Sequence, residues 1–219
     1  MTQVLDQKPE HQFPLINKIK STRRNKGISL LAAAYILMIL VMFILPLFSV
    51  PDYSIIHNSL SELGAQFSTN AWIMNFVFVF LALGSIIAGW RYFEGFVLHR
   101  IVLVLFGISL ALTAFFNHAP VNPDIQYNIS EDGWNSYFIS SAGLSFIILS
   151  IATSFILEKQ LDRLLAVAAG ISAILLSVLM SEFDWSAGIW QKLQFIISFG
   201  WMIYTFKTRD VKSEDETHP

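Results

Sequence analysis

Four side chains that could do acid–base chemistry lie in two segments between long apolar stretches. His57 and Glu62 lie in YSIIHNSLSELGAQFSTN, and His118 and Asp124 lie in NHAPVNPD. An imidazole and a carboxylate held together could act as general acid and base, so these four are the candidate catalytic residues. His118 and Asp124 could also ligate Zn²⁺, although their spacing matches no HExxH or comparable motif. The simpler alternative is that His118 is a hydrogen-bonded anchor at the membrane interface.

The first segment also has a structural interpretation. Ser59 and Glu62 have the spacing of a capping box, in which each side chain binds a backbone amide at the start of a short helix, and Gly64 could end that helix. This interpretation leaves His57 and Asn58 without a role. The segment can therefore be a capped turn, one wall of a site, or both.

Apolar residues are too frequent in this segment for a solvated loop. Leu60, Leu63 and Phe67 recur at helical spacing, so we expect them to form one buried face. Ser61 and Glu62 should then lie on the opposite face, toward the second segment or toward the last apolar stretch. The segment is expected to fold over one end of the protein and to line a polar pocket there.

The last apolar stretch provides further polar groups. Gln191, Gln194 and Ser198 lie on one helical face, which should point into the protein and away from lipid. Lys192 lies beside this face and either extends to the membrane interface or pairs with an acid such as Glu62. The candidate binding residues are Asn58, Ser61, Asn117, Asn135, Gln191, Lys192 and Gln194.

The composition is that of a membrane protein. Hydrophobic residues make up 54% of the 219 residues and charged residues 14%, whereas a soluble domain carries about 25% charged residues. The absence of cysteine excludes disulfides, thiolate metal sites and a cysteine nucleophile. The basic residues form no extended patch, so nucleic-acid binding is not expected.

Apolar stretches of about 20 residues, the length needed to cross a bilayer as a helix, divide the chain. None alternates apolar and polar residues as a membrane β-barrel requires. We predict an all-α polytopic membrane bundle of six transmembrane helices, with a short interfacial helix after the first span. Residues 27–206 would form the membrane domain, between a basic segment (1–26) and a polar tail (207–219). The expected spans are 28–49, 71–90, 100–117, 136–156, 164–181 and 187–206.

Lysine and arginine occur in the N-terminal segment, the second and fourth connections and the tail, whereas the first, third and fifth connections contain none. Because cytoplasmic loops are enriched in these residues, both termini are predicted to be cytoplasmic, in a multi-pass protein of the cell membrane. The two segments with the candidate residues would then face outward.

The motifs also resemble those of a known family. The segments YSIIHNSLSELGA, NHAPVNPD and GIWQKLQFIISFGWMIY are similar to the six-span membrane proteins catalogued as domain of unknown function 998, and the resemblance covers residues 28–206. It implies the six-span fold and no particular activity. In that family the start of the fourth span often carries a histidine, and this chain has Trp134, Asn135 and Ser136 there. The chain therefore departs from any three-point site that uses that histidine.

Three functions are compatible with these observations. The favoured one is an outward-facing polar pocket that binds a lipid headgroup or small amphiphile, with membrane lipids as partners and no cofactor. The alternatives are a metal-dependent or acid–base hydrolase or lipid-modifying enzyme, with zinc as its metal, and a transporter component. No acid or base lies near the middle of a span, which argues against proton coupling.

Small residues recur at helical spacing in the fifth span. They predict close helix packing, with contact between copies in a homo-oligomer as the alternative. These residues are Ala166, Gly170, Ala173 and Ser177.

Overall fold

The computed structural model describes the backbone of residues 13–208, and the side chains from residue 26 onward except that of Asp184. The described chain is helical and contains no strand. Its elements are α1 (Phe13–Ile44), η1 (Leu45–Phe48), α2 (Leu60–Leu63), α3 (Ala71–Tyr92), α4 (Val97–Leu112), α5 (Ile129–Ser154), α6 (Gln160–Glu182), η2 (Asp184–Ser186) and α7 (Ala187–Lys207).

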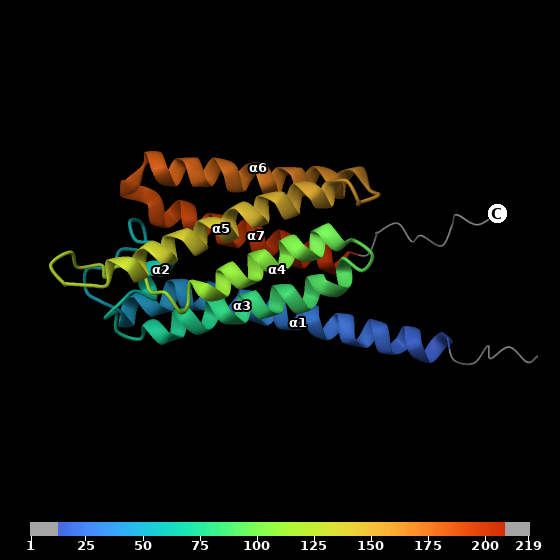
Figure 1. Cartoon of the computed structure of the whole chain (residues 1–219), viewed down its shortest axis with the longest axis horizontal. Helices are drawn as coiled ribbons and strands as arrows, with labels where there is room; N and C mark the ends of the chain where they lie inside the picture. Colours follow the sequence, from blue (N-terminus) through green and yellow to red (C-terminus); the bar gives the residue numbers. More distant parts are fainter. Residues whose placement is uncertain (1–12, 209–219) are drawn as a thin grey trace, which may run out of the picture.

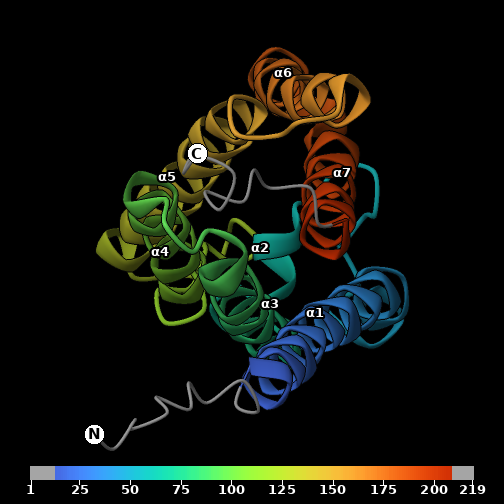
Figure 2. The same ribbon diagram turned by 90° about the vertical axis from the view of Figure 1, so that its right-hand side faces the viewer.

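The six long helices run along a common axis (Figure 1). Viewed from one end they form a ring in the order α1, α3, α4, α5, α6, α7, which closes where α7 contacts α1 (Figure 2). The short helix α2 contacts α3 and α7 at one end of the ring. We call this end, with the connections 45–70, 113–128 and 183–186, the α2 end.

Four helices are long and apolar enough to cross a membrane: residues 26–48 of α1 and η1, and the whole of α3, α5 and α6. The helix α4 is apolar but has only 16 residues. The helix α7 has 21 residues, with strongly polar side chains in its first two turns. Large apolar side chains are exposed on the outside of the ring, as expected where lipid chains replace water: Ile36, Phe76, Leu105, Leu144 and Leu175. The protein is therefore a membrane-embedded helical bundle.

The helix bounds differ from the expected spans at three places. The backbone of the predicted segment 1–26 is already helical from Phe13, and residues 1–12, like the tail from residue 209, lie outside the described residues. The helix α5 begins at Ile129, because the side chain of Asn128 accepts hydrogen bonds from the amides of Ser130 and Glu131. The helix α4 ends at Leu112, before the predicted limit of residue 117.

Asn135 explains the early end of α4. Its amide nitrogen donates hydrogen bonds to the carbonyl oxygens of Thr113, at 3.0 Å, and Phe116, at 2.6 Å. A continuing α-helix would need these two carbonyls for its own backbone hydrogen bonds. The Asn135 side chain of α5 thus stabilises a turn where α4 would otherwise continue.

Close approach of neighbouring helices depends on small residues. A Cβ atom on Gly84 of α3 would lie 2.9 Å from the Cα atom of Leu31 in α1. A Cβ atom on Gly170 of α6 would lie 2.7 Å from Oγ of Ser150 in α5. At Gly170, the small-residue face predicted for the fifth span therefore packs against a helix of the same chain.

Candidate functional site

The predicted capping box is confirmed. Oγ of Ser59 accepts a hydrogen bond from the amide of Glu62 at 3.2 Å, and the Glu62 carboxylate accepts one from the amide of Ser59. The helix α2 is a single turn that ends at Gly64. Tyr53 fixes the start of this turn, because its hydroxyl donates to the carbonyl of Ser59 at 2.9 Å. Burial, and secondarily the Glu62 carboxylate, raise the pKa of Tyr53, so this hydroxyl stays protonated at neutral pH.

The expected faces of this segment are only partly correct. Leu60 and Leu63 are completely buried, as predicted, but Phe67 is 71% exposed and Ser61 only 3% exposed. The backbone of Phe67 has a φ of 60°, in the left-handed region, so the chain turns there and the helical spacing ends before it. Ser61 is buried because α2 contacts both α3 and α7, which leaves little of its surface free.

The backbone carbonyl groups of residues 55–58 accept hydrogen bonds from the first turns of α7. The amide of Gly188 donates to the carbonyl of His57 at 3.1 Å, and the amide of Ile189 donates to that of Ile56 at 3.2 Å. A helix begins with amides that lack a partner within the helix, so this segment provides a cap from a distant part of the chain. His57 strengthens the contact, because its Nδ1 is hydrogen-bonded to the carbonyl of Trp185.

Lys192 joins the same segment to α7. Its ammonium group donates to the carbonyl oxygens of Asn58 at 2.7 Å, Ile55 at 2.9 Å and Gly188 at 3.3 Å. The residue is only 4% exposed, and its ammonium is held within the turn at the α2 end. The Glu62 carboxylate acts on the ammonium electrostatically, but the direct partners are main-chain carbonyls. Lys192 therefore holds the turn in place.

Gln191 contacts both the turn and the interior. Its Oε1 accepts a hydrogen bond from the amide of Leu60, the first residue of α2, at 2.6 Å. Its side chain also lines a cleft between the helices that is described below. The Gln191 side chain therefore lies between α2 and the cleft.

Gln66, which no sequence pattern indicated, connects the two predicted segments. Its backbone amide donates to the carbonyl of His118 at 2.9 Å, and its side-chain amide donates to the carbonyls of Asn117 and Asn128, each at 3.1 Å. Its Oε1 accepts from the amide of Asn128 at 2.9 Å. All these partners are backbone groups of a distant loop, and backbone groups leave no signature in the sequence.

The candidate catalytic residues are spread over the α2 end. Nδ1 of His118 lies 3.7 Å from a carboxylate oxygen of Asp132. The same carboxylate accepts the amide hydrogen of Ala119 at 2.7 Å. Asp124 is exposed on the loop, and His57 is exposed beside α7. Within the described part of the chain, no three His, Asp or Glu side chains come together as a metal site. The catalytic and metal-binding roles of these residues stay predictions.

Two candidate binding residues join helices to the connection 113–128. Oδ1 of Asn117 accepts a hydrogen bond from Nδ2 of Asn75 in α3 at 2.9 Å. Asn135 is 1% exposed and holds the end of α4, as described above. These contacts account for both side chains structurally, and their role in ligand binding stays a prediction.

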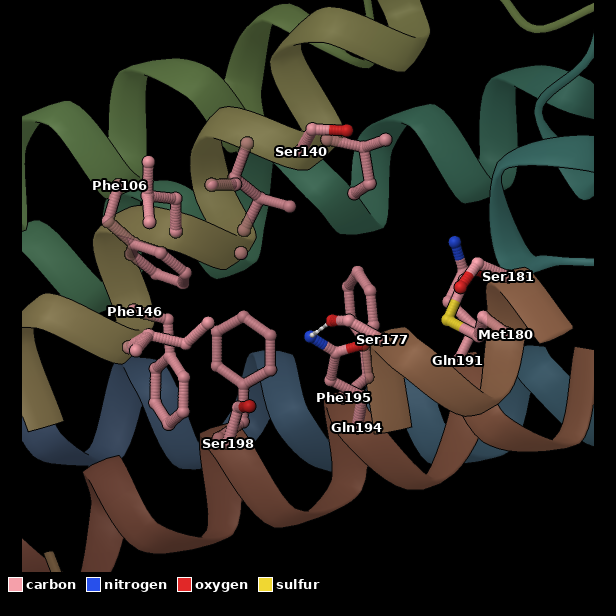
Figure 3. A pocket seen from close by; sticks show the side chains of 17 residues that line it. Phe106, Ser140, Phe146, Ser177, Met180, Ser181, Gln191, Gln194, Phe195 and Ser198 are labelled. Atoms are coloured by element: carbon pink, nitrogen blue, oxygen red, sulfur yellow. Dashed lines mark hydrogen bonds between the residues drawn. The ribbon is translucent and has the colours of Figure 1, made fainter. Parts of the chain in front are cut away.

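A cleft of about 530 Å³ lies between α5 and α6, with α7 and α4 behind it (Figure 3). The two helices diverge toward the α2 end (Figure 1), whereas Gly170 and Ser150 hold them together farther along. Ser140 of α5 and Ser177 and Ser181 of α6 line the cleft and are exposed. The cleft therefore reaches the surface of the bundle between α5 and α6.

The lining of the cleft combines apolar side chains with uncharged polar ones (Figure 3). Its apolar lining includes the buried side chains of Phe106, Phe146 and Phe199. None of its 17 lining residues is charged. The polar lining residues are Ser140, Ser177, Ser181, Gln191, Gln194 and Ser198. Gln194 donates to Oγ of Ser177 at 3.3 Å, which links α7 to α6 across the cleft.

The comparisons with known proteins agree with this architecture. A family model described as "Protein of unknown function (DUF998)" matches residues 31–206. The chain belongs to this family. The match extends from α1 to the end of α7 and confirms the resemblance seen in the motifs. No curated protein and no solved structure matches the chain. The family description names no function, and the apolar helices indicate a multi-pass helical membrane protein.

Proposed function

We propose that the protein crosses the membrane six times and binds one amphiphilic lipid in the cleft between α5 and α6. The uncharged lining of the cleft, apolar with hydroxyl and amide groups among the apolar side chains, carries this proposal. Apolar side chains suit an acyl chain, and the hydroxyl and amide groups suit the polar head of the same molecule. A volume of about 530 Å³ lies within the range of roughly 300–1,000 Å³ that is usual for small-molecule sites.

The position of the cleft supports the same proposal. It opens between two helices whose outer faces carry exposed apolar side chains, such as Leu144 and Leu175. A lipid could enter from the bilayer without passing through water. None of the 17 lining residues is a His, Asp or Glu, so the acid–base groups of the hydrolase hypothesis lie outside this cleft. Binding is the function that the geometry supports best.

Six spans and an outward-facing α2 end complete the proposal. The helices α4 and α7 run beside the four apolar helices through the same bundle. The connections at the α2 end contain no lysine or arginine, whereas Arg91, Arg100, Lys159 and Arg163 flank those at the opposite end. By the distribution of positive charge, the α2 end faces away from the cytoplasm.

The orientation can be tested by cysteine labelling, because the chain contains no cysteine. Gln126 at the α2 end and Glu94 at the opposite end are both exposed. On intact cells, a membrane-impermeant maleimide should label Q126C and leave E94C unlabelled, whereas permeabilised cells should show labelling of both. Labelling of E94C on intact cells would refute the proposed orientation.

Lipid binding can be tested by filling the cleft. A Cβ atom on Gly143 would have ordinary contact with Gln194 at 3.8 Å, so a larger side chain there enters the cleft without forcing α5 out of place. We expect G143L to reduce the lipid that remains bound to the purified protein by at least about tenfold, because the ligand and the new side chain need the same space. Native mass spectrometry of the detergent-released protein measures the bound fraction.

The matched control is G133L on the same helix. Gly133 is exposed, and a Cβ atom there would have no neighbour within 4 Å. This variant should bind lipid like the original protein. Equal lipid binding by G143L and G133L would show that the cleft is not the binding site.

A further inference from the structure

We infer that the cleft selects an uncharged lipid, one whose head carries ester, carbonyl or hydroxyl oxygens, as an acylglycerol does. This inference rests on the proposed function and specifies the ligand of the same site. Three observations support it: the absence of charge in the lining, the engagement of Lys192 with the turn, and two side-chain amides whose amino groups can donate to a ligand.

The first observation concerns the lining. All of its polar side chains are neutral serines and glutamines. A phosphate or carboxylate that leaves water for such a site loses its hydration without gaining a counter-charge. A neutral head loses less, and its oxygens can be paired by hydroxyl and amide groups. The lining therefore favours a head without charge.

The second observation concerns Lys192, the cation adjacent in sequence to the cleft residue Gln191. Its ammonium donates to three carbonyls, two of which belong to the turn residues Ile55 and Asn58. An anionic head could recruit this ammonium only if these hydrogen bonds were broken and the turn released. Lys192 is therefore committed to the fold and does not serve the cleft.

The third observation concerns donors. Oε1 of Gln191 is already bound to the amide of Leu60, so the amino group of this side chain is the part left for a ligand. The amino group of Gln194 donates a long hydrogen bond, 3.3 Å, to Oγ of Ser177. An oxygen of a ligand could replace Ser177 as the acceptor. The hydroxyls of Ser177 and Ser181 already donate to the carbonyls of Ala173 and Val178, so the amide amino groups are the donors that a ligand would meet. Such groups match the acceptor oxygens of an ester or a hydroxyl.

The test compares two lipids with the same acyl chain, a monoacylglycerol and a lysophosphatidic acid. Full-length protein in detergent is titrated with each, and native mass spectrometry gives the bound fractions. We expect the monoacylglycerol to bind at least about tenfold more tightly. G143L should weaken its binding by a similar factor, which assigns the adduct to the cleft.

A second variant is designed to gain affinity, because misfolding can reduce binding but does not increase it. Q194K introduces a cation into the lining and should increase the affinity for lysophosphatidic acid at least about tenfold, whereas the neutral Q194M should not. Equal binding of both lipids by the original protein, sensitive to G143L, would overturn the selectivity and leave the proposed function intact. Binding of neither lipid, or binding that is insensitive to G143L, would overturn the proposed function and the inference with it.

Discussion

Replacement of Gly188 by alanine should lower the thermal stability of the detergent-solubilised protein by roughly 6–12 °C, the shift expected from about 3 kcal/mol of overpacking. A Cβ atom at this position would lie 2.2 Å from the carbonyl oxygen of Asn58 and 2.8 Å from that of Ile56. Both contacts are with backbone, which cannot move aside as a flexible side chain can. The turn would have to leave α7, and the hydrogen bonds that cap this helix would be lost with it.

The matched control is G133A. Gly133 lies in α5 and has open space around it, so an added methyl group meets nothing there. Alanine has a higher helix propensity than glycine by about 1 kcal/mol, so this variant should be unchanged or slightly more stable. Size-exclusion measurements after heating give both midpoints. A G188A protein as stable as G133A would show that the turn does not pack against α7 in this way.

Replacement of Lys192 by methionine should open the turn locally. Methionine preserves most of the length of the side chain but cannot donate hydrogen bonds to the carbonyls of Ile55, Asn58 and Gly188. Unpaired buried carbonyls cost about 1–3 kcal/mol, so a net loss near 2 kcal/mol should speed hydrogen exchange of the turn amides roughly 30-fold. Hydrogen exchange followed by mass spectrometry of peptides from residues 53–63 measures this.

The same substitution at Lys207 provides the control. Lys207 is exposed in the last turn of α7, at the end opposite to α2. K207M should leave the exchange of residues 53–63 unchanged, because it removes no contact with the turn. If K192M also left this exchange unchanged, the ammonium would not hold the turn. Lys192 would then be available to an anionic ligand of the cleft.

Sequence patterns predicted the parts of the site whose partners lie a few residues apart. The capping box of Ser59 and Glu62 is an example, because both of its hydrogen bonds close within three residues. The burial of Leu60 and Leu63 followed from their helical spacing. The predicted burial of Phe67 was wrong because the backbone turns at that residue. Helical spacing predicts a shared face only while the helix continues.

Contacts between distant segments were not predictable. Lys192 was expected to reach the interface or pair with an acid, but its partners are carbonyls. Gln66 likewise binds the backbone of Asn117, His118 and Asn128. Every residue has a carbonyl group, so residue type does not indicate which carbonyl will lie within reach. Only the path of the folded chain brings these groups together.

Composition and apolar length by themselves determined a helical membrane protein and the approximate bounds of its long helices, and the spacing of Ser59 and Glu62 determined its capped turn. These features depend on the transfer of apolar residues into lipid and on hydrogen bonds between near neighbours, both of which can be read along the chain. Only the tertiary structure decided that residues 55–58 cap α7 and that α5 and α6 diverge to form a cleft. Such crossings depend on how side chains pack along whole helix interfaces. The small residues around Gly170 indicated close packing but not its partner helix, and no local pattern indicated the contact of Gly188 with the turn.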